Sequence, residues 1–285
     1  MNLEHSIIAF IGPGVMAEAI ISGLIREQVA KPENMIASGP RRARTEQLQD
    51  LYGITPHSEN AGAAEPADVV ILAVKPQQID IVLEGLSGAI KPDALVLSIV
   101  AGATIRKISQ GLKHAKVVRS MPNTPAQIGE GITVWTASEE TTEAQRTVAS
   151  QILEALGEAV YVEQENYLDM ATALSGTGPA YVFLFMEAMI DAGVHLGFSR
   201  RLATELVMET VQGAVEYARQ APEHLAKMRN QVTSPGGTTA EAMYQLEKGR
   251  LRTVLSDGVW AAFRRCTQLG AQNDQNHDGR PYRSS

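Results

Sequence analysis

Near its start the chain has a β-branched run followed at once by a glycine-rich turn, Ile7-Ile8-Ala9-Phe10-Ile11-Gly12-Pro13-Gly14-Val15-Met16-Ala17. The turn matches the pattern G-x-G-x-x-A where a predicted strand gives way to a predicted helix. Gly12 permits the tight turn, Gly14 lets a pyrophosphate approach the backbone, and Ala17 lets the helix pack closely on the strand. The free N–H groups of the helix N-terminus attract phosphates. The pattern predicts a dinucleotide-binding domain, against the alternative of a glycine turn without a ligand.

The first half of the chain alternates short apolar runs with helix-compatible segments. We predict strands at 7–11, 34–38, 68–74, 94–100, 116–120, 131–137 and 159–163, and helices at 15–29, 41–51, 77–86, 104–112 and 142–156. The strands are apolar throughout, which is typical of a sheet covered on both faces. Strand, helix and strand in this order predict an α/β fold with a doubly wound, Rossmann-type parallel sheet over residues 1–164.

The second half contains helical patterns only. We predict helices at 179–196, 199–220, 240–247 and 251–269. The helix at 179–196 is apolar nearly all round, which predicts burial on every side. We therefore expect an all-α domain at 165–273 that a partner subunit helps to cover, followed by a polar flexible tail at 274–285.

Composition excludes several classes of protein. The 285 residues carry a net charge of −7, which argues against a nucleic-acid partner. A single cysteine, Cys266, and six scattered histidines predict no metal site. No uninterrupted apolar run approaches the about 18 residues of a membrane helix, and no targeting segment is visible. We expect a cytoplasmic protein without a membrane partner.

The residues at the end of the second predicted strand indicate which dinucleotide is bound. An NAD site places Asp or Glu there to hold the ribose 2′-hydroxyl. This chain has Ser38-Gly39-Pro40-Arg41-Arg42-Ala43-Arg44 instead, with three arginines and no acid. Guanidinium groups fit a 2′-phosphate, so NADP(H) is favoured. Use of NAD(H) stays open, as does a solvated basic helix start with no ligand.

Three later strand ends should meet at the same crevice, because ligands of open parallel sheets bind beyond the carboxyl ends of the strands. The segments are Ala73-Val74-Lys75-Pro76, Ile99-Val100-Ala101-Gly102 and Ser120-Met121-Pro122-Asn123-Thr124-Pro125. Lys75 is the only charged group in its run, and Asn123 offers an amide to a nicotinamide or a substrate. The prolines of these segments also have a purely structural interpretation.

Two loops of small residues stand in the helical half, Ser175-Gly176-Thr177-Gly178-Pro179 and Ser234-Pro235-Gly236-Gly237-Thr238-Thr239. The second combines hydroxyls, glycines and a helix start, which is suited to holding a carboxylate, although an ordinary threonine N-cap explains part of it. No lysine or histidine lies between Tyr167 and Val194, where related hydroxy-acid dehydrogenases carry a catalytic lysine. A C=N bond needs such a group less than an alcohol does.

Five blocks, in order along the chain, resemble the Δ1-pyrroline-5-carboxylate reductase family. They are Phe10-Ile11-Gly12-x-Gly14-x-Met16-Ala17, Ala73-Val74-Lys75-Pro76, Met121-Pro122-Asn123-Thr124-Pro125, Leu174-Ser175-Gly176-x-Gly178-Pro179-Ala180-Tyr181 and Ser234-Pro235-Gly236-Gly237-x-Thr239. Pro13 and Val15 depart from the Ala and Asn that are common in the family. The resemblance implies NAD(P)H-dependent hydride transfer to C5 of pyrroline-5-carboxylate, giving L-proline, by a homodimer that often assembles into a decamer.

The resemblance also implies roles for individual residues. Thr239, whose hydroxyl matches the contact to the ring nitrogen, and Lys75 are expected to be catalytic. The residues expected to bind substrate are Val232, Ser234, Gly236, Gly237, Thr238, Thr239 and Ala101. Those expected to bind the coenzyme are Gly12, Gly14, Val15, Met16, Ser38, Arg41, Arg42, Ser58, Ala73, Val74, Lys75, Pro76, Ala101, Gly102 and Asn123. Ser58 stands at a position matching a cofactor-contacting asparagine.

Two other functions remain open at this point. One is a dehydrogenase of the same architecture that acts on a hydroxy acid, against which the missing lysine counts. The other is a non-catalytic NADP(H)-binding protein whose helical half serves assembly.

Overall fold

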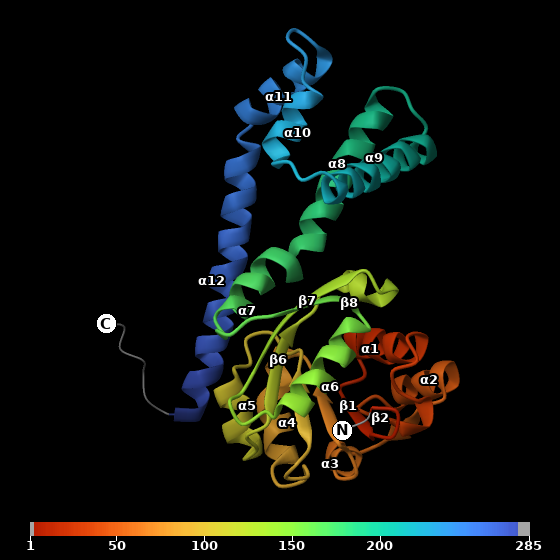
Figure 1. Cartoon of the computed structure of the whole chain (residues 1–285), viewed down its shortest axis with the longest axis vertical. Coiled ribbons are helices and arrows are strands. Elements are labelled where there is room, and N and C mark those ends of the chain that lie inside the picture. Colours follow the sequence, from red (N-terminus) through yellow and green to blue (C-terminus); the bar gives the residue numbers. More distant parts are fainter. Residues whose placement is uncertain (1–2, 279–285) are drawn as a thin grey trace. The chain divides into compact units, whose positions relative to one another are not determined.

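A computed structural model of the chain describes residues 3–278, with side chains as far as Gly270 (Figure 1). The chain divides into two compact units. The first holds the residues up to Thr177 together with the chain from Ala262 onward, and the second is Gly178–Ala261. The first unit extends beyond the predicted boundary at 164/165 because α7 (Tyr167–Ala171) packs on strands of the sheet.

The first unit is built on one eight-stranded sheet with the order β3-β2-β1-β4-β5-β6-β7-β8. The strands are β1 (Ile8–Ile11), β2 (Met35–Ser38), β3 (Thr55–His57), β4 (Val69–Leu72), β5 (Leu95–Ser98), β6 (Val117–Met121), β7 (Gly131–Ala137) and β8 (Gly157–Tyr161). The first six strands are parallel, which confirms the predicted doubly wound sheet.

The last two strands depart from the parallel arrangement. β7 runs antiparallel to β6, and β8 is parallel to β7. A parallel pair needs a long crossover connection, whereas β6 and β7 are joined through the short helix η3 (Thr124–Ile128). The chain therefore turns back on itself here, and the expectation of parallel strands is wrong for β7.

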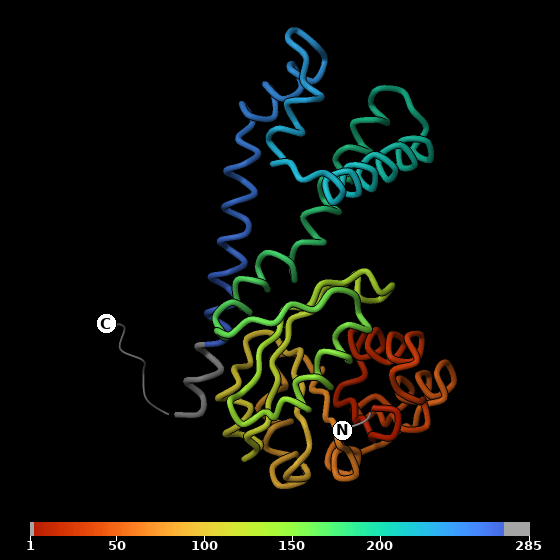
Figure 2. Tube along the Cα trace, viewed as in Figure 1, coloured from red at the N-terminus to blue at the C-terminus, as the bar shows by residue number. Residues whose placement is uncertain are grey.

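Helices cover both faces of this sheet, because its strands are apolar on both sides (Figure 2). In β1, Ile8 and Phe10 belong to one core, whereas Ala9 and Ile11 belong to the other. The first core includes side chains of α1 (Val15–Arg26), α2 (Arg42–Tyr52) and α6 (Glu143–Glu154); the second includes those of α3 (Asn60–Ala64), α4 (Ile79–Leu86) and α5 (Ile105–Leu112). This alternation is the period of two expected for a strand buried on both faces.

The second unit contains helices only. They are α8 (Gly178–His195), α9 (Arg200–Gln220), α10 (Leu225–Gln231), α11 (Thr238–Lys248) and the first part of α12 (Leu251–Asp278). α8 and α9 pack on each other around Gly193, where an added Cβ would lie 3.1 Å from the Cβ of Ala203. α8 was expected to be buried on every side, which is wrong within the single chain, since Phe183 and Leu184 are 61% and 66% exposed.

The helical elements α7, η4 (Thr172–Gly176) and α8 follow one another along the chain, with only Thr177 between η4 and α8. By length and composition alone, residues 167–195 could cross a membrane, and only 6% of the most apolar window is buried within the chain. An apolar helix that a protein partner covers passes the same test. Uninterrupted apolar runs alone do not reveal this segment, because polar residues interrupt the apolar ones within 167–195.

The last helix, α12, continues to Asp278. Residues 274–278 of the predicted flexible tail are therefore helical, and the rest of that tail lies outside the described residues. The part of α12 that belongs to the first unit lies against the loop after β5, where a Cβ on Gly102 would stand 3.1 Å from the backbone nitrogen of Gly270.

Candidate functional site

A cleft of about 670 Å³ lies at the carboxyl ends of the first four strands, where the strand order reverses about β1. Its lining comes from the turns that follow β1, β2, β3 and β4 and from the start of α4: Gly12, Pro13, Gly14, Gly39, Pro40, Arg41, Ser58, Asn60, Ala73, Val74, Lys75, Gln78, Ile81 and Val82. Such a reversal is where doubly wound folds bind nucleotides.

The glycine turn packs closely against the loop after β4. Gly12 has a φ of +97°, and a Cβ there would lie 2.7 Å from Cγ1 of Val74 and 2.9 Å from the carbonyl oxygen of Ala73. Gly14 is the N-cap of α1, and no side chain of the described residues caps that end. Val15 and Met16 follow in the first turn, whose N–H groups have no partner within the helix. The first turn of α1 therefore presents open backbone N–H groups, as a pyrophosphate requires, whereas the N–H groups of Gly12 and Gly14 already donate to the carbonyls of Ser38 and Gly12.

The three arginines after β2 differ in their surroundings. Arg41 is exposed, lines the cleft and makes no ion pair with a described residue. Arg42 pairs with Glu46 at 2.8 Å and lines an adjoining cleft of about 440 Å³ that shares Gly39, Pro40 and Ser58 with the first. Arg44 lines neither cleft and instead donates to the Pro13 carbonyl at 3.0 Å. Two guanidinium groups, rather than three, thus stand at these clefts.

Ser38 is fully buried, and its hydroxyl donates to Oδ1 of Asn60 at 2.5 Å. Asn60 itself lines the cleft beside Ser58. The sequence pattern did not indicate Asn60, because β3 and α3, the elements around it, are too short to show a clear periodicity. The run of small residues after Asn60, Ala61-Gly62-Ala63-Ala64, is the signal that could have indicated a helix start there.

The other loops expected to contact the coenzyme differ in how exposed their residues are. Lys75 is exposed in the cleft beside Ala73 and Val74 and makes no ion pair in the described part of the chain, and Pro76 begins the short helix η2 (Pro76–Gln78). Ala101 is half-buried, whereas Gly102 is buried against α12.

Asn123 is bonded within the chain. Its Nδ2 donates to the carbonyl of Ser175 at 3.2 Å, and its Oδ1 accepts from the backbone N–H of Ile132 at 3.0 Å. This side chain therefore joins the loop after β6 to β7 and to η4, and it is not part of the cleft lining.

A buried charge cluster, absent from the sequence analysis, joins the sheet to the helices that follow it. Arg119 of β6 is only 3% exposed and pairs with Glu165 at 2.9 Å and Asp169 at 2.6 Å. Burial opposes the charge on Arg119, but the two carboxylates outweigh burial and raise its pKa. Glu165 also accepts from the N–H of Ile105 at 2.8 Å, and the Cys266 thiol lies 3.6 Å from Asp169. Burial and Asp169 raise the pKa of Cys266, which keeps the thiol protonated.

The glycine–threonine loop of the second unit leaves a helix end open. Gly237 is the N-cap of α11, so Thr238 and Thr239 occupy its first turn, and no described side chain caps this end. Gly236 has a φ of +68°, and a Cβ on Gly237 would meet the hydroxyl oxygen of Ser234. The alternative of a threonine N-cap is therefore wrong. Val232, at the end of α10, is 67% exposed.

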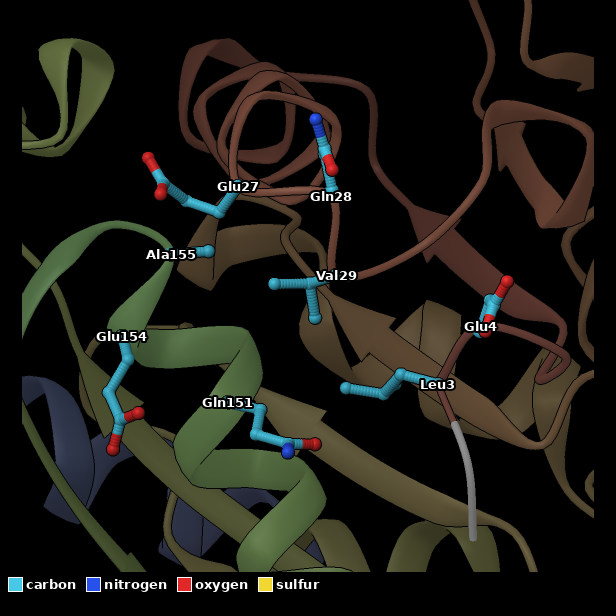
Figure 3. A pocket seen from close by; sticks show the side chains of 8 residues that line it. All are labelled: Leu3, Glu4, Glu27, Gln28, Val29, Gln151, Glu154 and Ala155. Carbon is cyan, nitrogen blue, oxygen red and sulfur yellow. The ribbon is translucent and has the colours of Figure 1, made fainter.

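A further hollow of about 550 Å³ lies near the amino ends of the strands, on the opposite side from the cleft (Figure 3). Three segments line it: residues before β1, the end of α1 with the residues after it, and α6. Of its three carboxylates, Glu4 pairs with Lys31, Glu27 pairs with Arg26, and Glu154 accepts from the hydroxyl of Ser150. No motif residue faces it. Among the residues whose side chains are described, no three His, Cys, Asp or Glu side chains are grouped to hold a metal.

Comparison with known proteins places this architecture in a family. Residues 165–269 match the family model "Pyrroline-5-carboxylate reductase dimerisation", and residues 7–102 match "NADP oxidoreductase coenzyme F420-dependent". The pyrroline-5-carboxylate reductase of Synechocystis sp. is 42% identical over 92% of this chain and 98% of its own length. The chain belongs to the pyrroline-5-carboxylate reductase family. The resemblance found in the sequence is thereby confirmed.

Other members of the pyrroline-5-carboxylate reductase family match this chain along most of its length, and a solved member has a similar fold. The reductase of Pseudomonas aeruginosa is 38% identical over 94% of this chain and 98% of its own length. The crystal structure of the Plasmodium falciparum enzyme with NADP bound has a TM-score of 0.87 at 31% identity, covering 94% of this chain and 99% of that one. Because α8 lies in the family's dimerisation segment, assembly with other subunits accounts for its exposed apolar surface.

Proposed function

We propose that this chain reduces the C=N bond of Δ1-pyrroline-5-carboxylate to give L-proline, with NADPH or NADH as reductant. The observation that carries the proposal is the match, along almost its whole length, to a relative named pyrroline-5-carboxylate reductase. Each unit contributes a fitting feature: a glycine turn shaped for a pyrophosphate in the first, and an uncapped helix start with hydroxyls in the second.

In this proposal the first unit holds the coenzyme, which when bound supplies the hydride that C5 accepts. The turn from Gly12 to Met16 receives the pyrophosphate, and Arg41 and Arg42 attract the adenosine 2′-phosphate. Their presence favours NADPH over NADH, because a guanidinium group gains a phosphate partner only with NADPH. The other coenzyme contacts proposed are Ser38, Ser58, Ala73, Val74, Lys75, Pro76, Ala101, Gly102 and Asn123.

The proposed substrate contacts begin with the carboxylate. The open N–H groups of α11 and the hydroxyl of Ser234 hold it, with Gly236 and Gly237 giving the backbone room. Thr239 hydrogen-bonds the ring nitrogen, which gains a proton as C5 gains the hydride. Thr238, Val232 and Ala101 complete the proposed substrate contacts, and Lys75 is the second proposed catalytic residue. Catalysis rests mainly on fixing the ring in reach of the reductant.

We further propose that two copies of the chain form a homodimer through the segment 165–269, with the decamer as a larger assembly of dimers. The exposed apolar side chains of α8 support this, since a partner subunit would bury them. We propose that the protein acts in the cytoplasm, with the apolar residues within 167–195 covered by another subunit and not by a membrane.

The test is oxidation of NADPH, followed by absorbance, with pyrroline-5-carboxylate as substrate and repeated with NADH. We expect consumption of NADPH and formation of proline. Oxidation of simple 2- or 3-hydroxy acids with NADP⁺ in its place would indicate the hydroxy-acid dehydrogenase. Tight NADPH binding without consumption would indicate the non-catalytic binding protein.

A further inference from the structure

Arg44 turns away from the coenzyme cleft and binds the glycine turn from behind. Its Nε donates to the carbonyl oxygen of Pro13 at 3.0 Å, its Nη2 pairs with Glu18, and its Nη1 donates to Gln47 at 2.7 Å. Its side chain is only 18% exposed. Each of the three guanidinium nitrogens thus has a partner within the chain, and Arg44 lines neither cleft.

Glu18 places a negative charge in the first turn of α1, the helix whose N-terminus opens on the cleft. The hydroxyl of Tyr52 donates to its Oε1 at 3.0 Å. Burial raises the pKa of Glu18, but the bonds and charge of Arg44 and Tyr52 outweigh burial and hold it below its ordinary value, so the carboxylate is ionised. Unpaired, this charge would repel a bound pyrophosphate through the same helix end that attracts it.

Pro13 is held on its other side by the strand end after β2. An added Cβ on Gly39 would clash with Cδ of the Pro13 ring and lie 2.9 Å from its Cγ. The peptide of Pro13 is therefore fixed between Gly39 and the guanidinium of Arg44. The carbonyl of Pro13 shares one planar peptide with the nitrogen of Gly14, the N-cap of α1, so holding that carbonyl fixes the entry into the helix.

We propose that Arg44 is a positioning residue of the coenzyme site, which holds the Pro13 carbonyl and neutralises Glu18 so that the turn accepts a pyrophosphate. The inference takes from the proposed function only that the ligand is a dinucleotide. It assigns to Arg44 a role shared by NADPH and NADH, since both contain the pyrophosphate. Arg41 and Arg42, by contrast, meet only the 2′-phosphate of NADPH.

The test compares dissociation constants for NADPH and NADH, measured by fluorescence titration without substrate. Arg44→Met should weaken both by the same factor, about tenfold. The matched control, Arg41→Met with Arg42→Met, should weaken NADPH alone. Adding Glu18→Gln to Arg44→Met should recover most of the affinity for both coenzymes, which a merely structural loss would not do.

Several results would overturn the inference. These are a loss confined to NADPH in Arg44→Met, no loss with either coenzyme, or no recovery on adding Glu18→Gln. Should Arg44→Met not fold, Arg44→Lys serves instead, because lysine keeps the charge beside Glu18 but cannot hold Pro13 as well. It should weaken both coenzymes equally and by less than tenfold, and a loss of NADPH binding alone would contradict the proposal. Failure of the unaltered chain to bind either coenzyme would instead count against the proposed function.

Discussion

At the scale of single residues, the candidate site depends more on backbone geometry than on side chains. Gly12 and Gly237 both stand where a Cβ would collide with neighbouring atoms, and both precede an uncapped helix start. The sequence predicted the turn and the helix start at these positions, because glycine patterns report local geometry; their binding roles stay predictions. It did not reveal the hydrogen-bond partners of Asn123 and Ser38, since Ser175 and Asn60 lie far away in the sequence.

Gly12→Ala should abolish NADPH binding and destabilise the fold. A methyl group at a φ of +97° is strained, and it would meet Val74 at 2.7 Å. Gly85→Ala is the matched control, since an added Cβ there has no neighbour within 4 Å and alanine favours a helix. Thermal unfolding and NADPH titration check both variants. If the two variants had the same stability and the same affinity for NADPH, the proposal that the turn at Gly12 binds the coenzyme would be contradicted.

Thr239→Ala should lower kcat/KM for pyrroline-5-carboxylate by about 10²-fold, the lower end for a group that assists proton transfer. Steady-state kinetics measure this, with Thr239→Ser as the variant that keeps the hydroxyl and should retain most of the activity. The affinity for NADPH should not change, because Thr239 is proposed to contact the substrate and not the coenzyme. Near-normal kinetics in Thr239→Ala would remove Thr239 from the mechanism.

At the scale of elements, the sequence predicted the elements with strong apolar periodicity and missed those without it. β1, β4 and β5 are buried on both faces and therefore read as apolar runs. β3 is a short edge strand that includes Pro56, and α3 and α10 are only 5 and 7 residues long. Edge strands tolerate proline and polar residues, so composition does not reveal them. The cluster around Arg119 joins β6, α5, α7 and α12, and depends on contacts that no local pattern shows.

Arg119→Met should destabilise the first unit by about 3 kcal/mol, because it leaves Glu165 and Asp169 beside one another without their shared cation. Chemical unfolding followed by circular dichroism measures the change. Arg42→Met, which breaks an exposed pair with Glu46, is the control and should change stability by less than about 1 kcal/mol. A comparable loss in the two variants would contradict a structural role for the buried cluster.

At the scale of the whole molecule, the single chain leaves exposed an apolar surface that a partner subunit was expected to help cover. The sequence identified α8 as a helix that must be covered, but one chain does not contain the covering surface. The family model for dimerisation spans this helix, and a partner subunit supplies what the chain lacks. The burial of α8 is thus a property of the assembly. The apolar pattern in the sequence indicates that the helix is buried, but not which chain covers it.

Phe183→Asp should convert the assembly to monomers, because a charge would be placed on a helix face that a partner subunit covers. Size-exclusion chromatography with light scattering measures the mass. Leu51→Asp is the control, since Leu51 is 58% exposed on α2, outside the dimerisation segment, and should leave the assembly intact. An unchanged mass for Phe183→Asp would exclude this face of α8 from the interface.

The most direct test of the central claim follows the transferred hydrogen. The chain is given pyrroline-5-carboxylate and NADPH carrying deuterium at the transferable position of nicotinamide C4, and the product is analysed by mass spectrometry. The account predicts proline with a single deuterium at C5. Unlabelled proline, or no proline while NADPH remains unconsumed, would contradict it.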